Sequence, residues 1–134
     1  MKQSSVVVLI NPDTGQCLGA TRRGTNSFGL VGGKKDDNEA PHDAAFREFK
    51  EEVGIELIHE MDFLGTMIDG EHEVSIYFVF HPIDVLRVIT WIGKEGRSIE
   101  WGIHVKFVPY SELIAGPFTE FNIKLIDIIF KHLI

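Results

Sequence analysis

The stretch GGKKDDNEAPHDAAFREFKEEVGI, residues 32–55, places three acidic side chains in the last turns of a predicted helix. These residues are Glu48, Glu51 and Glu52. Carboxylates near a helix C-terminus face the negative end of the helix dipole, and like charges three or four residues apart repel. Each effect costs a few tenths to about 1 kcal/mol. A feature that offsets this cost is therefore expected beside the helix.

Local signals define the ends and the buried face of this helix. Pro41 suits the first helical position, and Gly54 suits a left-handed C-cap. Ala45, Phe49 and Val53 recur every four residues, which predicts a buried stripe along one face. The sequence therefore predicts a single long helix between the proline and the glycine.

The three glutamates share one face of this helix. At about 100° per residue, Glu52 lies about 40° to one side of Glu48 and Glu51 about 60° to the other. A hard divalent cation such as Mg²⁺ prefers oxygen ligands, which carboxylates and substrate phosphates supply. The alternative is a solvated acidic surface in which Arg47 and Lys50 provide local ion pairs. The helix by itself does not decide between the two.

Length and composition predict a single domain over residues 1–134. With 44% hydrophobic and 25% charged residues, the chain has the composition of an ordinary soluble globular protein. The formal net charge of -7 and the pI of about 5.3 argue against an extended nucleic-acid surface. A small nucleotide held through a metal ion stays compatible with this charge.

No sequence feature predicts secretion or membrane insertion. Cys17 is the only cysteine, so an internal disulfide cannot form. The first residues, MKQSSVVVLI, lack the apolar length and the cleavage site of a signal peptide. Apolar runs such as VSIYFVF are far shorter than the roughly 20 residues that span a bilayer. A cytoplasmic protein is expected.

Strand patterns lie on both sides of the helix. Residues 5–10 and 16–23 predict two strands joined by the turn NPDTG, and hence a hairpin. The segment LVGG at 30–33 predicts a short strand end followed by a glycine turn. The middle of the chain is expected to be mostly sheet, with strands in 56–68, 72–82 and 100–109 and a loop at 91–98.

A second helix is predicted over residues 120–134, where Thr119 can act as the N-cap. Its apolar positions cover more than one face, so it should pack against the sheet or against another subunit. A monomer and a homodimer both stay open. The elements together predict an α+β or mixed α/β domain.

The spacing of fixed residues across 33–55 resembles the Nudix box, glycine-x5-glutamate-x7-arginine-glutamate-apolar-x-glutamate-glutamate-x-glycine-apolar. Every fixed position matches: Gly33, Glu39, Arg47, Glu48, Phe49, Glu51, Glu52, Gly54 and Ile55. A chance match at the seven specified residues has odds of about one in a billion. The resemblance implies the Nudix α/β/α sandwich with a mixed central sheet.

The resemblance also implies a metal site. Glu52 and Glu51 would be the main ligands, Glu48 would add to the metal and water network, and the Gly32 carbonyl would face the ion. Mg²⁺ is the expected cofactor, with Mn²⁺ as the alternative.

Arg47 has a separate implied role as a positioning residue. In the family the arginine of the box braces the loop glutamate, which is Glu39 in this chain. A bidentate guanidinium suits that role. Two positions depart from the common family pattern: Val31 stands where a proline often precedes the glycines, and the apolar box position is the bulky Phe49.

A second resemblance covers WIGKEGRSIEW, residues 91–101, which is similar to a loop of MutT-type nucleoside triphosphate pyrophosphohydrolases. It implies that Glu95 is a loop carboxylate that completes the metal site. A solvated turn glutamate is the alternative. Glu100 is the competing carboxylate, although its place before Trp101 favours a role at the start of a strand.

Residues outside the box are candidates for contacting the substrate. The segment ATRRG resembles the end of a family strand where an arginine reaches the phosphates, so Arg23 is the candidate and Arg22 a weaker one. A surface charge is the alternative for both. Four residues are candidates for the base pocket by position, although each aromatic one also fits a core role: Phe28, Tyr77, Phe118 and Thr119.

The resemblance implies a metal-dependent hydrolase that cleaves a nucleoside triphosphate to the monophosphate and pyrophosphate. Alternative substrates are a dinucleoside polyphosphate, ADP-ribose, a nucleotide sugar or an RNA 5′ end. The tyrosine or proline that marks two of those subfamilies is absent at Gly70, Glu71 and His72. A nucleotide sensor that does not hydrolyse its ligand is the rival class, and the complete set of acids argues against it.

Overall fold

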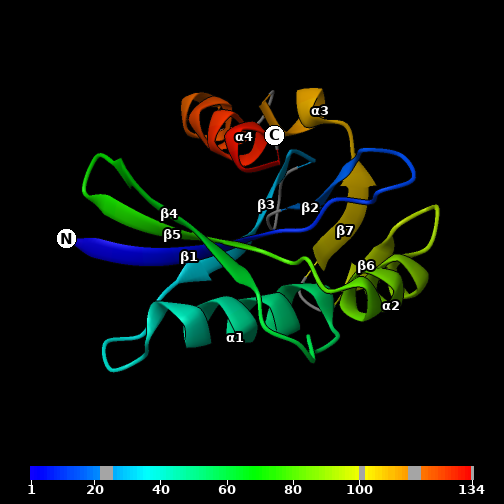
Figure 1. The fold of residues 1–134 in the computed structure, drawn as a ribbon, viewed down its shortest axis with the longest axis horizontal. Coiled ribbons are helices and arrows are strands. Elements are labelled where there is room, and N and C mark those ends of the chain that lie inside the picture. The colour runs from blue at the N-terminus through cyan, green and yellow to red at the C-terminus, as the bar shows by residue number, and fades with distance from the viewer. Residues whose placement is uncertain (22–25, 100–101, 115–118, 134) are drawn as a thin grey trace.

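A mixed sheet with helices on both faces forms the fold in the computed structural model, which describes residues 1–21, 26–99, 102–114 and 119–133 (Figure 1). Its strands are β1 (Lys2–Val8), β2 (Cys17–Thr21), β3 (Phe28–Lys34), β4 (Asp62–Asp69), β5 (His72–Phe78), β6 (Arg97–Ile99) and β7 (Ile103–Val108). Its helices are α1 (Pro41–Val53), α2 (Pro82–Ile92), α3 (Tyr110–Ile114) and α4 (Thr119–Leu133).

The seven described strands run in the order β4-β5-β1-β3-β2-β7-β6, and β1 pairs with β5 in parallel while the other pairs are antiparallel. Helices α1 and α2 cover one face of the sheet, and α3 and α4 cover the other (Figure 1). Val7 and Val8 are both fully buried but belong to the cores on opposite faces, as the alternation along a strand requires. The expected α/β/α sandwich with a mixed sheet is confirmed.

The predicted hairpin between the first two strands is wrong. The turn itself forms, because Asn11 N–H donates to the Gln16 carbonyl at 2.8 Å and Leu18 N–H to the Leu9 carbonyl at 2.9 Å. Beyond an isolated bridge between Ile10 and Cys17 the two strands part, and β3 lies between them in the sheet. A tight turn fixes the reversal of the chain, but strand pairing depends on a segment that comes later in the sequence.

The glycine turn predicted within residues 30–33 is also wrong, because β3 continues through both glycines to Lys34. Gly32 pairs with Val6 and Gly33 with Ser5 on β1. A Cβ at Gly32 would collide with the Ser5 carbonyl and lie 2.7 Å from the Val6 Cα. The glycine is needed for close packing between two strands, and its backbone has a φ of 154°, which side chains rarely adopt.

The middle of the chain contains a helix that the sequence did not predict. Pro82 occupies the first turn of α2, and the His81 ring accepts a hydrogen bond from the Ile83 N–H at 3.2 Å as an N-cap. The buried positions recur every four residues at Asp84, Val88 and Ile92. Because one of these positions is charged and the segment is rich in valine and isoleucine, the sequence shows no apolar pattern typical of a helix. Part of the predicted loop at 91–98 is therefore helix, and its end begins β6.

Helix α1 has the predicted ends and buried face. Ala45, Phe49 and Val53 are fully buried, and Gly54 adopts a left-handed φ of 88°. The first turn is fixed to the sheet, because the buried Ser5 hydroxyl donates to the Pro41 carbonyl at 2.7 Å. Side-chain burial and this bond orient the opposite face of α1, which carries the acids.

Helix α4 packs on the sheet, which is one of the two arrangements expected for it. Leu125 and Ile129 are buried in the core that it shares with α3 and the sheet, and the Asn122 amide donates to the Leu113 carbonyl at 2.6 Å. Within the described residues the helix begins at Thr119, so the residue predicted as its N-cap is itself helical. None of the helices in the described ranges is both long and apolar enough to cross a membrane.

A buried carboxylate, Asp84, connects the segment after α1 to the start of α2. It is 1% exposed and accepts hydrogen bonds from the backbone N–H groups of Ile58 at 3.0 Å and His59 at 2.8 Å. Arg87 lies 3.3 Å from it on the same helix. Burial opposes its ionisation, but these hydrogen bonds and charges hold the pKa of Asp84 below its usual range.

We expect Asp84→Asn to lower the free energy of unfolding by about 1–3 kcal/mol, because an amide replaces an acceptor of two buried N–H groups. A lowered pKa stabilises the fold above the unfolded-state pKa of about 3.9, and this contribution is lost as the pH falls through the lower folded-state pKa. Urea unfolding should therefore show a larger difference in the free energy of unfolding between the variant and the native chain at pH 7 than at about pH 3.

The control for this prediction is Asp127→Asn, which changes an exposed carboxylate 3.9 Å from Lys131 on α4. Its unfolding should match that of the native chain at both pH values. Equal stability of Asp84→Asn and the control at pH 7 would contradict the role given to Asp84.

Candidate functional site

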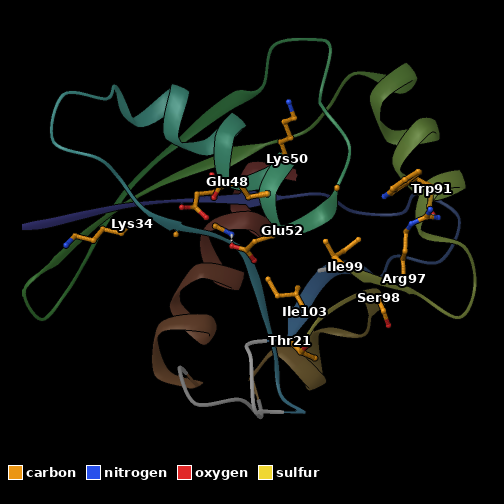
Figure 2. A pocket seen from close by; sticks show the side chains of 14 residues that line it. Thr21, Lys34, Glu48, Lys50, Glu52, Trp91, Arg97, Ser98, Ile99 and Ile103 are labelled. Atoms are coloured by element: carbon orange, nitrogen blue, oxygen red, sulfur yellow. Dashed lines mark hydrogen bonds between the residues drawn. The ribbon is translucent and has the colours of Figure 1, made fainter. Parts of the chain in front are cut away.

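A cleft of about 1020 Å³ lies between the acidic face of α1, the end of β3 and the segment around β6 (Figure 2). This is at the upper end of the roughly 300–1,000 Å³ of ligand pockets. One side carries the acids, the glycines of β3 and two lysines, and the other is more apolar. The lining residues are Thr21, Gly32, Gly33, Lys34, Glu48, Lys50, Glu51, Glu52, Gly54, Trp91, Arg97, Ser98, Ile99 and Ile103.

The glycines of β3 allow α1 to lie close to the strand. The Gly32 N–H donates to Glu52 Oε1 at 3.1 Å. A Cβ at Gly33 would lie 2.6 Å from the Glu48 carboxylate carbon, which is closer than side chains can approach. The two box glutamates nearest the strand are therefore held against bare backbone, and any side chain at Gly33 would displace Glu48.

Arg47 is the cation that connects the acidic residues. Its guanidinium binds Glu39 in a bidentate pair, with Nε 2.8 Å from Oε2 and Nη2 3.0 Å from Oε1. Its Nη1 lies 3.0 Å from Glu48 and 3.3 Å from Glu51, and Nη2 also donates to the Lys34 carbonyl at 3.0 Å. The structure thus contains the predicted pair with Glu39, and the same arginine reaches two of the box glutamates.

Two of the carboxylates differ in their electrostatics. Burial raises the pKa of Glu48, whose side chain is only 14% exposed, even though Arg47 favours its charged form. The hydrogen bond from Arg47 lowers the pKa of Glu39. A desolvated carboxylate gains from an added positive charge, so a cation beside Glu48 would favour its charged form.

The donor set fits a hard divalent cation in chemistry. Carboxylate oxygens of Glu48, Glu51 and Glu52 line one cleft beside the backbone of Gly32, and oxygen is the donor that Mg²⁺ prefers. Among the described side chains, no three histidine, cysteine or acidic groups converge as ligands of one ion. In this arrangement Glu48 and Glu51 bond to Arg47 and Glu52 to Gly32. The metal ligands named from the sequence stay a prediction.

Several other candidates are not brought to the cleft or lie outside the described residues. Glu95 is exposed in the turn after α2 and is not among the lining residues, so its role as a metal ligand stays a prediction. The residues named from the sequence that lie outside the described ranges are Arg22, Arg23, Glu100, Trp101 and Phe118, together with the side chain of Thr119.

The two remaining base-pocket candidates pack elsewhere. Tyr77 on β5 is 6% exposed, and its ring lies 5.3 Å from that of Phe63 and 5.8 Å from that of His42. Phe28 packs against the core under α3 and α4. Neither residue lines the described cleft, so the structure places both in packing roles that the sequence had offered as the alternative.

The model of the NUDIX domain family matches residues 1–127. The chain belongs to the NUDIX domain family. The resemblance seen in the box residues is thereby confirmed for nearly the whole sequence, and the acidic face of α1 is the Nudix box of this chain.

Related proteins share parts of the sequence or the fold. An RNA pyrophosphohydrolase of Marinomonas sp. (strain MWYL1) is 39% identical over 59 residues, which are 44% of this chain but only 35% of that protein. A mutT/nudix family protein from Listeria innocua has a TM-score of 0.59 at 17% identity, covering 98% of this chain and 96% of that chain. An ADP compounds hydrolase has a TM-score of 0.66 at 17% identity, covering 98% and 72%. The two structures are similar in fold alone.

The sequence placed the segment 91–101 at the site through Glu95, but it missed the residues that line the wall facing the Nudix helix. Trp91, Arg97, Ile99 and Ile103 line it, but they come from α2, β6 and β7, which meet only in the folded chain. A proline and an N-capping histidine at 81–82 were the available signal for α2. No local pattern would have placed Arg97 against Trp91.

We expect Arg47→Lys and Glu39→Gln each to lower the melting temperature by a few degrees, because a lysine cannot form the two parallel bonds of the guanidinium fork. Because the two residues share these bonds, the double variant should lose clearly less than the sum of the single losses. Thermal unfolding followed by circular dichroism measures all three.

The control for this prediction is Lys131→Gln, which removes an exposed cation on α4 whose nearest acidic partner is 3.9 Å away. Its melting temperature should stay within about one degree of the native value. Fully additive losses in the double variant would show that Arg47 and Glu39 act independently.

Proposed function

We propose that this Nudix chain hydrolyses a nucleoside diphosphate linked to another group, and that it cleaves a nucleoside triphosphate to the monophosphate and pyrophosphate. The observation that carries the proposal is the row of Glu48, Glu51 and Glu52 along one wall of a cleft large enough for a nucleotide. Carboxylates alone repel a polyphosphate, so a cleft lined in this way suits the substrate only with cations between them.

The residues of the box have distinct tasks in this proposal. Glu48, Glu51, Glu52 and the Gly32 carbonyl would hold divalent metal, Mg²⁺ or Mn²⁺, which supplies water activation and charge neutralisation at the phosphates when bound. Arg47 positions Glu48 and Glu51 through its bonds at 3.0 and 3.3 Å, and Glu39 positions Arg47. Burial raises the pKa of Glu48, and a cation bound beside it would favour its charged form.

An RNA 5′ end is the second candidate substrate, because the partly matching relative is named an RNA pyrophosphohydrolase. Both candidates contain the same pyrophosphate linkage at a nucleotide. The net charge of -7 disfavours a long RNA path across the surface, so a triphosphorylated end would have to be bound mainly by its terminal nucleotide. An ADP compound, which also contains a diphosphate linkage, is a further candidate substrate, because the chain shares its fold with an ADP compounds hydrolase.

The experiment is a panel of substrates incubated with the protein and Mg²⁺, with nucleotide products separated by chromatography and phosphate and pyrophosphate measured apart. The panel holds the four common nucleoside triphosphates, a 5′-triphosphorylated RNA, ADP-ribose and a dinucleoside polyphosphate. Monophosphate and pyrophosphate in equal amounts from a triphosphate are expected. Binding without turnover across the whole panel would instead identify a nucleotide sensor.

We expect Glu52→Gln to lower turnover of the best substrate by about 10²- to 10⁴-fold, because an amide is a neutral and weaker ligand. The amide oxygen can still accept the Gly32 N–H, and one repelling charge is removed from the end of α1, so the melting temperature without metal should be unchanged or higher. Turnover and thermal unfolding are measured on the same preparation.

Glu56→Gln is the matched control, because Glu56 lies just past α1, pairs with Lys50 at 2.7 Å and does not line the cleft. It should retain near-native turnover. Full activity of Glu52→Gln at saturating Mg²⁺ would overturn the assignment of the metal site, and a large loss of melting temperature would mark Glu52 as a structural residue.

A further inference from the structure

The end of the cleft beyond the acids is formed by an arginine that lies flat on a tryptophan. The Arg97 guanidinium carbon is 3.4 Å from the centre of the Trp91 ring, and Arg97 Nη1 donates to the Trp91 carbonyl at 3.1 Å. One face of the guanidinium is covered by the indole and one N–H is used. The side chain therefore has a fixed position although it is exposed.

Trp91 is itself attached to the Nudix helix. Its indole N–H donates to the Val53 carbonyl in the last turn of α1 at 2.9 Å. Gly54 follows directly, and a Cβ placed there would meet the Trp91 ring at 3.5 Å and Ile99 at 3.3 Å. The stack of Arg97 on Trp91 is thus fixed relative to Glu52, which lies two residues before Gly54.

The charge of Arg97 is not neutralised by a carboxylate within the described part of the chain. No carboxylate there forms a salt bridge with it, although the protein has 20 acidic and 13 basic residues. Arg87, by comparison, pairs with Asp84 on the same side of the sheet. An immobilised arginine at a cleft mouth with an open face and open donors is suited to receive a ligand.

The chemistry of the cleft changes from one end to the other. Glu48 and Glu52 lie at one end, Trp91 and Arg97 at the other, and Figure 2 shows Ile99 between Glu52 and Arg97. A metal-bound phosphate chain would occupy the acidic end. A sugar and a base suit the apolar and aromatic end, because a planar base can stack on a guanidinium face.

We propose that Arg97, held on Trp91, is the platform on which the nucleobase of the substrate stacks. This inference rests on the proposed function, since it assigns the second half of the same nucleotide site. The guanidinium would lie between the indole and the base, with one of its faces against each ring. Stacking uses the face that every base has, so this contact favours nucleotides over polyphosphates without selecting strongly among bases.

The rival role for Arg97 is a contact with phosphate, which its charge would also allow. The two roles predict different ligands whose binding weakens when the arginine is replaced. A base platform affects a nucleotide but not inorganic tripolyphosphate, which has no base, whereas a phosphate contact affects both. Arg97→Lys keeps the charge but removes the planar face. It should therefore weaken nucleotide binding if Arg97 is a base platform, and leave binding unchanged if Arg97 contacts phosphate.

The test compares the native chain with Arg97→Gln and Arg97→Lys, using isothermal titration in Mg²⁺. The ligands are a nucleoside triphosphate with a methylene group in place of the α,β-bridging oxygen, and tripolyphosphate. We expect both variants to bind the nucleotide about ten-fold more weakly, with binding of tripolyphosphate unchanged. In steady-state turnover of the natural triphosphate, KM should rise by a similar factor while kcat changes much less.

Lys94→Gln is the control, because it removes one exposed positive charge from the same turn without touching the described cleft lining. It should bind both ligands as the native chain does. An equal loss for nucleotide and tripolyphosphate, or native binding by Arg97→Lys, would overturn the base platform in favour of a phosphate contact. Native nucleotide affinity in both Arg97 variants would overturn it outright.

The two proposals can fail separately in this experiment. If the native chain turns over nucleotides and the Arg97 variants match it, the base platform is wrong and the proposed function stands. If the native chain binds tripolyphosphate but neither binds nor hydrolyses any nucleotide, the proposed function is wrong and the platform falls with it.

Discussion

The repulsion among carboxylates at the end of α1 is the constraint around which this Nudix chain is arranged. Glu48, Glu51 and Glu52 share one helical face near the negative end of the helix dipole, where each additional charge lowers the stability of the helix. Arg47 reduces this repulsion, because its one guanidinium forms a bidentate pair with Glu39 and also bonds to Glu48 and Glu51. The acidic wall is therefore kept assembled by an internal cation whose position the loop before the helix determines.

The sheet supplies the second condition for that wall, which is close approach. Gly33 leaves the space in which the Glu48 carboxylate lies, and the Gly32 N–H binds Glu52. The same glycines pair with β1, and the buried Ser5 of β1 holds the first turn of α1 through the Pro41 carbonyl. One strand pair thus fixes the start of the helix and the depth of its acidic end, so the positions of the carboxylates follow from backbone packing as much as from charge.

The sequence predicted the parts of the molecule that depend on local chemistry. The ends of α1 and its buried stripe of Ala45, Phe49 and Val53 follow from residues fewer than fifteen positions apart. The pair of Arg47 with Glu39 was implied by the resemblance to the Nudix box. The sequence did not predict which strands pair. The turn after β1 suggested a hairpin, but β3 separates β1 from β2, and only the complete sheet decides that order.

The second wall of the cleft escaped prediction for a related reason. Helix α2 is rich in β-branched residues, which favour strands. Its buried face is formed by Asp84, Val88 and Ile92, and because one of these is charged, the sequence shows no apolar helical stripe. Because residues 83–90 were assigned to no element and 91–98 to a loop, the neighbours of Trp91 and Arg97 were not predicted. The hydrogen bond between α2 and the end of α1 joins residues 38 positions apart in the sequence, and no local pattern predicts it.

The bond from Trp91 to the Val53 carbonyl explains how the two ends of the cleft keep a constant separation. Carbonyls in the last turn of a helix lack partners within the helix, and the indole N–H supplies one at 2.9 Å just before the chain turns at Gly54. The acids lie on the same last turns of α1 that this bond terminates. The end of α1 therefore has the carboxylates on its side and the indole of Trp91, from α2, bonded to its last turn. Because Arg97 lies on that tryptophan at 3.4 Å, this one bond links the acidic end of the cleft to its aromatic end.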